Sequence, residues 1–448
     1  MAHLRAPTLF AVILCAALHL AHLPPAWATS DADGADEAPS ERVFDAPQFI
    51  EGLIRQGQIG QADTLLQAVR EAGDESDQIL FLSGLVAAQL GRHSEAIGFF
   101  RRVLGRDPKL LRVRLELARA FFQVKDDENA KRNFELVLSE NLPPNVKDNI
   151  ARFLDEIRRR RATRYSFGFV LTPSTNINQA PNIRTVRLFG LPFRLDDAAR
   201  QKTGVGAVTR ASVERFEKLS ENVRLRVGAR IIHTDYAKRR FDDSFASVHV
   251  GPQFLRGASE HSLLAGISNR YFGGKFFSQT RQFTVESNWV RGNRTQLKNT
   301  LGFGRTIFNG RPLQNSNFAF IAPSITRVLN SFSLVRFSTS LRRENARSDV
   351  FSQTAWSFAA AYQRDFRLGI TVVAEPRFSR RSFQERQVAF SATRFDTLRG
   401  ISLSVLKRDL RVLGFAPQFT LDYARNSSTV DLFAYTRVQA LFGVTRNF

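Results

Sequence analysis

The chain has 448 residues, enough for two domains, because single hydrophobic cores rarely extend beyond about 250–300 residues. Its only Cys and its only Met are Cys15 and Met1, so the chain beyond residue 28 has no thiol and must be stabilised by packing alone. The net charge of +22 raises nucleic acid as a partner, but the export signal described next argues against that class.

Residues 1–28 have the pattern of a secretory signal peptide. Arg5 supplies the positive start, residues 9–20 form an apolar run shorter than the roughly 20 residues of a membrane helix, and Ala26 and Ala28 suit a signal peptidase. Cys15 follows Leu14 inside the apolar run, a context that does not favour lipid attachment. We therefore expect an exported protein that begins with a flexible acidic leader at residues 29–44.

Residues 45–161 repeat themselves with a period of 34. The recurring columns are Ala62, Ala96 and Ala130; Leu66, Phe100 and Phe134; Val69, Val103 and Val137; and Gly57, Gly91 and Lys125. This spacing resembles the tetratricopeptide repeat, a helical hairpin that stacks into a solenoid with a concave face. By that resemblance the concave face would carry candidate client-binding residues, which are Phe81, Leu85, Arg112, Leu115, Arg119 and Phe122. The alternative is that the apolar members pack against neighbouring helices.

Residues 162–448 change to a period of two. They hold 43 Lys and Arg against 19 Asp and Glu, whereas residues 30–161 hold 20 against 23. In residues 223–233 the apolar side chains alternate with charged ones, and one face carries several Arg. The basic residues predicted to line a water-filled lumen are Arg224, Arg226, Arg230, Arg336 and Arg342. A soluble β-sandwich would bury these Arg at a cost of several kcal/mol each, so a membrane barrel is favoured.

Fourteen alternating segments follow one another, with connections that are alternately tight and longer. An even number of strands returns both ends of the barrel to one side of the membrane, which predicts an outer-membrane barrel with the helical domain in the periplasm. The chain ends on Phe448 after an aromatic-rich segment, as substrates of the barrel-assembly machinery commonly do. The predicted fold is thus a two-domain α + β protein, an N-terminal tetratricopeptide-repeat α-solenoid followed by a 14-stranded antiparallel transmembrane β-barrel.

The first barrel segment leads into an Asn-rich phrase. Its residues are Pro173, Ser174, Thr175, Asn176, Ile177, Asn178 and Gln179. Directly after a repeat domain, this phrase resembles the surface lipoprotein assembly modifier (Slam) family. The resemblance implies delivery of client proteins, often lipoproteins that capture iron or haem, across the outer membrane to the cell surface. The phrase itself could cap a turn, plug the barrel or contact a client.

No catalytic, cofactor or metal motif accompanies these features. The seven His are isolated, without zinc-ligand spacing, so we expect no metal, no cofactor and no enzymatic activity. The expected partners are a client lipoprotein or secreted protein, outer-membrane lipids and the barrel-assembly machinery, without nucleic acid. Two other transport functions stay open: an exopolysaccharide export porin with a basic lumen, and a general solute channel.

Overall fold

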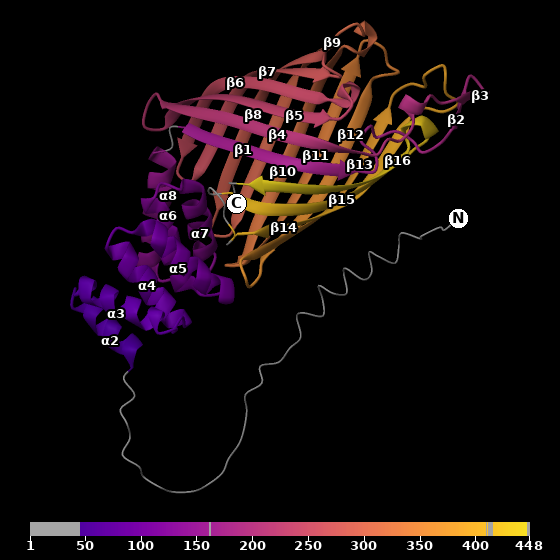
Figure 1. The fold of residues 1–448 in the computed structure, drawn as a ribbon. Coiled ribbons are helices and arrows are strands. Elements are labelled where there is room, and N and C mark those ends of the chain that lie inside the picture. The colour runs from indigo at the N-terminus through magenta and orange to yellow at the C-terminus, as the bar shows by residue number, and fades with distance from the viewer. Residues whose placement is uncertain (1–44, 161–162, 409, 411–414, 446–448) are drawn as a thin grey trace, which may run out of the picture. The chain divides into compact units, whose positions relative to one another are not determined.

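The computed structural model describes residues 45–160, 163–408, 410 and 415–445. The predicted signal peptide at 1–28, the acidic leader at 29–44 and the terminal Phe448 lie outside the described residues. Within these ranges a helical domain is followed by a closed barrel of fourteen antiparallel strands (Figure 1), which confirms the predicted fold class. None of the described helices is long and apolar enough to cross a membrane.

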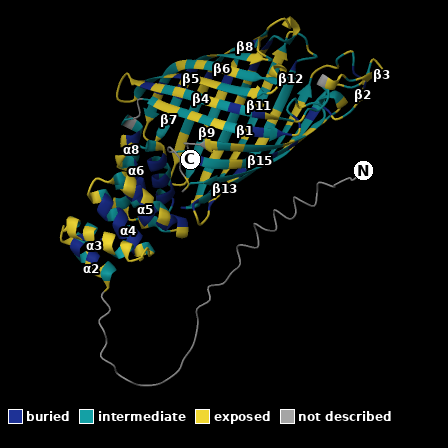
Figure 2. Ribbon diagram, viewed as in Figure 1, coloured by how far each residue is buried: buried dark blue, intermediate teal, exposed yellow. Residues whose placement is uncertain are grey.

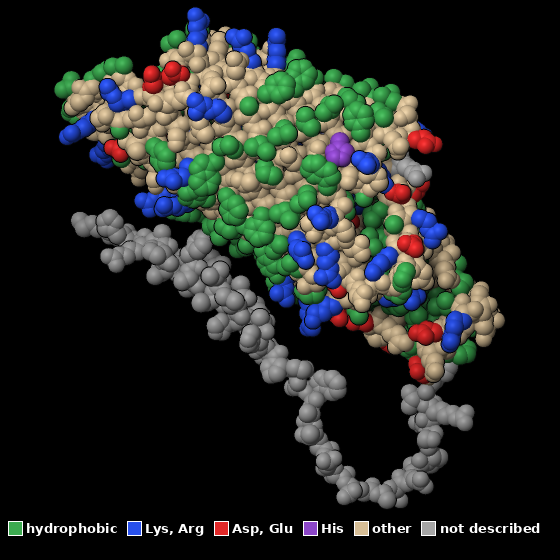
Figure 3. All heavy atoms as spheres, turned by 180° about the vertical axis from the view of Figure 1, so that it is seen from behind, with side chains coloured by type: hydrophobic (Ala, Val, Ile, Leu, Met, Phe, Trp, Pro, Cys, Tyr) green, Lys and Arg blue, Asp and Glu red, His purple; other side chains and the backbone are tan. Residues whose placement is uncertain are grey.

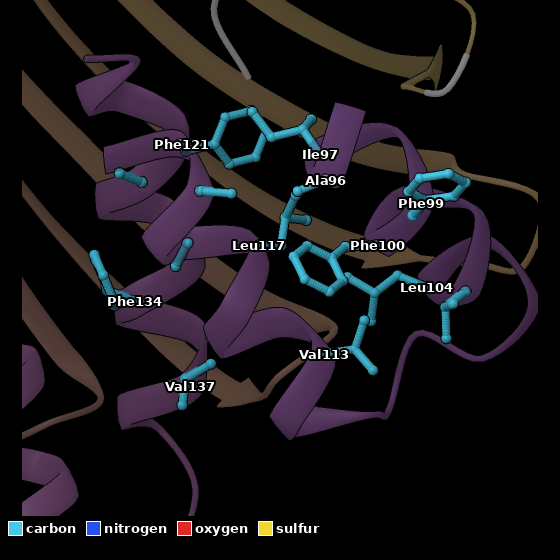
Figure 4. Packing of buried hydrophobic residues seen from close by; sticks show 14 of the residues in the cluster. Ala96, Ile97, Phe99, Phe100, Leu104, Val113, Leu117, Phe121, Phe134 and Val137 are labelled. Carbon is cyan, nitrogen blue, oxygen red and sulfur yellow. The ribbon is translucent and has the colours of Figure 1, made fainter. Parts of the chain in front are cut away.

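Seven described helices form the helical domain. They are α2 (Ala46–Arg55), α3 (Ile59–Glu71), α4 (Asp77–Gln89), α5 (His93–Arg106), α6 (Leu111–Gln123), α7 (Asp127–Leu138) and α8 (Pro144–Arg160). The second helix of each repeat presents the recurring small residue to the core, because Ala62, Ala96 and Ala130 are all fully buried. The larger column, with Phe100 and Phe134, fills the space between repeats (Figure 4).

The turns inside the repeats explain another column. Gly57 and Gly91 have φ angles of 76° and 77°, and Lys125 has a φ of 60° at the equivalent position. This left-handed backbone suits glycine, so the third repeat keeps the turn despite a residue that fits it less well. Gly84 in α4 has a different role, because a Cβ there would lie 2.4 Å from a ring carbon of Phe100.

The barrel strands alternate outward apolar and inward polar side chains. The strands are β1 (Thr163–Ser174), β4 (Gly204–Lys218), β5 (Val223–Tyr236), β6 (Asp243–Arg256), β7 (Ser259–Phe272), β8 (Lys275–Arg291), β9 (Thr295–Phe308), β10 (Ser316–Asn330), β11 (Ser333–Ala346), β12 (Gln353–Asp365), β13 (Ile370–Phe383), β14 (Phe395–Lys407), β15 (Ala416–Ser428) and β16 (Tyr435–Thr445). Outward residues such as Phe283, Phe303 and Phe337 stay about half exposed. Figure 2 shows exposed and intermediate residues alternating along the barrel strands. Hydrophobic side chains gather over the outer surface, as Figure 3 shows for one face.

Most connections at one end of the barrel are longer than those at the other, with β7–β8 as an exception, joined by Gly273 and Gly274 alone. At the end where β1 begins, which we call the helical-domain end, β6–β7 and β10–β11 are joined by two residues each. At the far end the β1–β4 connection contains a hairpin, β2 (Thr185–Leu188) and β3 (Leu191–Arg194), within a segment that the sequence pattern suggested only as a long loop. Phe189 and Gly190 form its turn with positive φ angles, as two-residue hairpin turns require.

Replacing Gly84 by Ala is expected to destabilise the helical domain. The added Cβ would overlap the buried Phe100 ring, and overpacking of this kind costs about 1–3 kcal/mol. Gly98→Ala is the matched control, since a Cβ at this α5 position meets no heavy atom within 4 Å and alanine should stabilise the helix by about 0.5–1 kcal/mol. Thermal unfolding followed by circular dichroism at 222 nm should move in opposite directions for the two variants; parallel shifts would contradict the packing.

The two faces of one strand should respond differently to the same charge. Phe337 points outward from β11, while the next residue, Ser338, lines an internal cavity. Phe337→Arg should cost up to about 2–4 kcal/mol in a bilayer, whereas Ser338→Arg meets water. The yield of folded barrel from heat-modifiability gels, with unfolding in denaturant, measures this difference. Equal yields for both variants would mean that the face assignment is wrong.

Candidate functional site: the barrel interior and its mouth

The interior of the barrel contains ion pairs that cross the lumen. Arg226 of β5 donates to Glu214 of β4 at 2.6 Å and to Glu286 of β8 at 3.0 Å. Strands β5 and β8 are separated by two other strands in the sheet, so the side chains of Arg226 and Glu286 must meet inside the barrel. His249 of β6 joins this cluster with its Nε2 atom 3.6 Å from Glu214.

The other predicted lumen residues also point inward. Arg224 donates to the backbone oxygen of Arg158 at 2.7 Å, and Arg230 lines an internal cavity of about 250 Å³ together with Arg226. Arg336 donates to the hydroxyl of Thr326 at 3.2 Å. Arg342 lies 3.8 Å from the centre of the Phe318 ring. These positions fit the predicted basic lumen, and a role in transport stays a prediction for all five.

Carboxylates offset part of this positive charge. Asp422 of β15 accepts from Arg377 of β13 at 2.7 Å and from Arg437 of β16 at 3.3 Å. Asp243 holds Arg270 at 2.8 Å. The interior therefore alternates paired charges with water-accessible space instead of presenting Arg alone.

Two glycines of β9 make room for rings inside the barrel. A Cβ on Gly302 would lie 2.3 Å from the Phe320 ring, and one on Gly304 would lie 2.9 Å from the Phe318 ring. The two rings stack with centres 6.3 Å apart. The Gly-Phe-Gly sequence at 302–304 thus serves the packing of an inward aromatic pair on β10.

Helices and barrel together line a mouth at the helical-domain end. A cavity of about 780 Å³ lies between α7, α8 and the inner wall, and we call it the vestibule. Lys131 and Glu135 of α7 and Leu154 of α8 line it from the helical side, and Asn288 and Lys298 from the barrel. Charged, amide and apolar groups are thus mixed along the lining of the vestibule.

The repeats contact several strand connections at this end. Ser331, between β10 and β11, donates its backbone N–H to Glu140 at 2.7 Å. Arg294, between β8 and β9, donates to the backbone oxygen of Ser139. The backbone N–H of Leu368, between β12 and β13, donates to the Gly105 oxygen. These contacts fix α7 and the end of α5 against the barrel.

A buried carboxylate lies at the centre of this junction. Asp365, at the end of β12, is 2% exposed and accepts from Arg132 of α7 at 3.2 Å, from Arg408 at 2.8 Å and from the Thr371 hydroxyl at 2.8 Å. Arg114 of α6 is equally buried, with a guanidinium nitrogen 4.0 Å from the carboxylate. We call Asp365 with these three Arg the junction cluster.

Arg114 shows how burial in the junction cluster disfavours a charged side chain. Burial lowers the pKa of its guanidinium to about 10, with the nearby Asp365 opposing that shift, so Arg114 remains charged at neutral pH. Its own repeat satisfies it further, because it donates to the Pro108 oxygen at 2.8 Å and to Asn133 at 3.3 Å. Sequence reasoning missed the junction cluster, whose one early signal is an Arg among the apolar positions of α6.

The predicted concave-face residues separate into two kinds. The apolar ones (Phe81, Leu85, Leu115 and Phe122) are partly buried against the helical core. Arg112 and Arg119 flank Glu116 at 3.4 Å and 3.1 Å, and Arg112 is 72% exposed. The apolar residues thus have packing partners of their own, and contact with a client stays a prediction.

The Asn-rich phrase forms side-chain bonds with the backbone. Asn176 is fully buried and donates to the backbone oxygens of Ala180 at 2.8 Å and Thr436 at 3.2 Å. Asn178 donates to the Arg200 oxygen at 2.8 Å and accepts from the Lys202 N–H at 3.0 Å. Both amides thus bond the backbone of the first far-end loop, as a turn-capping role requires, and contact with a client stays a prediction.

Among the described residues, no group of three or more His, Cys, Asp or Glu is placed to hold a metal ion.

Asp365→Asn is expected to loosen the helical domain from the barrel. It leaves Arg114 buried without a carboxylate, and breaking a buried pair in this way costs about 3–5 kcal/mol. Asp396→Asn is the control, because Asp396 is similarly buried but pairs with Arg394 at the far end. Limited proteolysis between the domains should accelerate at least tenfold for Asp365→Asn alone. Equal cleavage rates for the two variants would contradict the assigned role.

Comparison with known proteins agrees with this architecture. The surface lipoprotein assembly modifier 1 of Neisseria meningitidis serogroup B is 24% identical over 388 residues, covering 85% of this chain and 78% of that protein. The surface lipoprotein assembly modifier 1 of Haemophilus influenzae is 22% identical over 453 residues, covering 96% and 92%. A bacterial polysaccharide outer membrane secretin of known structure has a TM-score of 0.34 and 12% identity over 63% of this chain and 98% of its own, too weak to bear on function.

Two family models match the two domains. One, described as surface lipoprotein assembly modifier, N-terminal TPR repeats, matches residues 45–134. The other, described as surface lipoprotein assembly modifier, matches residues 164–448, well over half of the chain. With its helical repeats, its closed barrel and these two matches, the chain belongs to the surface lipoprotein assembly modifier family and is an outer-membrane β-barrel protein.

Proposed function

We propose that this protein is a translocator that moves client proteins from the periplasm to the cell surface, without a catalytic step. The clients would be surface lipoproteins, among them proteins that capture haem or iron. The helical domain would lie in the periplasm, where it meets clients before they reach the barrel. The barrel-assembly machinery would insert the protein, and outer-membrane lipids would surround it.

The vestibule is the observation that carries this proposal. Helices of a repeat domain and the inner wall of the barrel line one cavity of about 780 Å³. A segment held by α7 or α8 would already be at the mouth of the lumen. Binding next to a pore raises the local concentration of the client there, which favours entry without an energy source.

The lumen carries carboxylates as well as an excess of Arg, which supports a polypeptide with charges of both signs as the transported chain. Arg226 is held by two carboxylates, and Asp422 is held between two Arg. Such pairs can exchange partners with either sign of client charge, whereas an anionic sugar chain would be attracted most by unpaired Arg. The walls of the lumen therefore suit a polypeptide that carries charges of both signs.

Deleting the gene should leave a genetically linked lipoprotein synthesised but trapped in the periplasm. Restoring residues 162–448 behind a signal peptide should display at least tenfold less client than the full chain, because the helical domain no longer concentrates the client at the mouth. Flow cytometry with antibody to the client, together with protease shaving, measures display, and blots of folded barrel check its abundance.

The other transport functions predict different results. If deletion leaves every surface lipoprotein in place and abolishes a secreted polysaccharide, the protein is an export porin. If only the uptake of small solutes changes, it is a solute channel. Full display of the client by the barrel alone would be consistent with translocation but would contradict the proposal that the repeats capture the client.

A further inference from the structure

Among the described residues, the closure of the barrel wall between β1 and β16 has fewer paired positions than any other strand pair in the barrel. The residues Tyr435–Thr445 of β16 all pair in register with β15, at eleven positions. Over the same described residues, β16 pairs with β1 at five positions, Gly168–Leu171 and Ser174. Strand β1 pairs with β4 at twelve positions, and the register partners of its first residues on β16 lie beyond Thr445, outside the described residues. We call the β1–β16 junction the seam.

The residues of β1 explain the interruption. Pro173 has no backbone N–H, and the register with β16 skips Thr172 and Pro173, as the register of β6 with β7 skips Gly251 and Pro252. A side-chain bond replaces the ladder of the seam there, in which Gln439 of β16 donates to the Thr172 hydroxyl. On β16, Gly443 permits the two strands to approach each other closely, since a Cβ there would lie 2.8 Å from a methyl carbon of Val170 on β1.

Side chains of the Asn-rich phrase hold the far end of the seam. The backbone N–H of Thr175 donates to the Val438 oxygen at 3.0 Å, and its hydroxyl accepts from the Val438 N–H at 3.0 Å. Asn176 donates to the Thr436 oxygen at 3.2 Å. Among the described residues the seam has the fewest paired positions, and side-chain bonds that exchange by rotation of one residue supplement its ladder, so we infer that it is the part of the wall that opens at least cost.

An apolar groove lies on the outward surface beside the seam. It has a volume of about 500 Å³, within the roughly 300–1,000 Å³ typical of ligand pockets. Phe169 and Leu171 of β1, Phe419 of β15 and Phe442 and Val444 of β16 line it. The rings of Phe419 and Phe442 lie 4.9 Å apart, and Phe442 is 52% exposed to the surroundings of the barrel.

We propose that the wall parts at the seam and that the groove binds an acyl chain of the client's lipid anchor as the anchor leaves the lumen for the bilayer. This inference rests on the proposed function. An acyl chain in a water-filled lumen exposes its methylene groups at about 0.8 kcal/mol each, so a lipid anchor is strongly favoured to leave sideways. A groove of apolar rings next to the opening receives such a chain, while the polypeptide stays between the charged walls.

A disulfide across the seam tests the opening. The chain has no Cys beyond Cys15, so Leu171→Cys with Phe442→Cys introduces one defined pair at facing positions. Display of a lipidated client should fall at least tenfold when this pair is oxidised and rise again on reduction. The control pair is Ala211→Cys with Ile231→Cys, at facing positions of β4 and β5 away from the groove, whose oxidation should change display less than twofold.

Photocrosslinking tests the groove directly. Benzoylphenylalanine at Phe442 should capture a client that carries a clickable acyl chain, and not the same client with its lipid-acceptor Cys replaced by Ser. The control position is Phe337, which is 47% exposed on the outward face of β11, away from the seam. Equal capture at both positions would show that the acyl chain contacts the barrel only as bulk lipid does. Absence of capture at Phe442 would also contradict the proposal that the groove binds the acyl chain.

The two proposals fail in different ways. If gene deletion abolishes display but the oxidised seam pair transports lipidated client normally, the seam inference is wrong and the translocator stands. If deletion itself leaves display intact, the proposed function is wrong. If the oxidised seam also blocks the client that lacks its lipid, the seam serves the polypeptide and the acyl-chain inference is overturned.

Discussion

In the hydrocarbon of a bilayer, each backbone N–H and C=O must be bonded within the protein, because no water is there to bond it. The ladders of the barrel satisfy that constraint, and most of the architecture follows from it. Each strand must turn one face to lipid, which leaves the charged face of β5 pointing into water. Where a ladder is interrupted, as at Pro173, side chains such as Gln439 must supply the missing bonds. An interruption is therefore costly to keep in the lipid-facing wall.

The same constraint separates two uses of buried charge. Inside the lumen, Arg226 lies between Glu214 and Glu286 beside a cavity of about 250 Å³, so exchange of partners costs less there than in a fully buried pair. In the junction cluster, Asp365 and Arg114 are each only 2% exposed, and neither can lose its partners without leaving a buried charge. The first arrangement suits a surface along which a chain moves. The second suits a fixed joint between the repeats and the barrel.

Periodicity predicted the parts of this structure that depend on local pattern. The 34-residue columns placed Ala96 and Phe100 in the helical core, and the alternation in β5 placed Arg226 inside the barrel. The hairpin β2–β3 was missed because its strands are four residues each, too short for an alternation to register. The junction cluster could not be predicted, since Arg132 and Asp365 lie 233 residues apart and meet only when the barrel has closed.

The Asn-rich phrase shows where sequence and structure had to be combined. Its composition left turn capping, a plug and client contact open, and in the structure Asn178 bonds the backbone at Arg200 and Lys202. Asn176, however, also bonds Thr436 across the seam, so one amide organises the loop and holds the first strand to the last. A residue with both bonds couples the conformation of the far-end loop to the closure of the wall. Movement of that loop and separation of the seam would therefore share one free-energy cost, and a segment that displaced the loop from Asn176 would also weaken the seam.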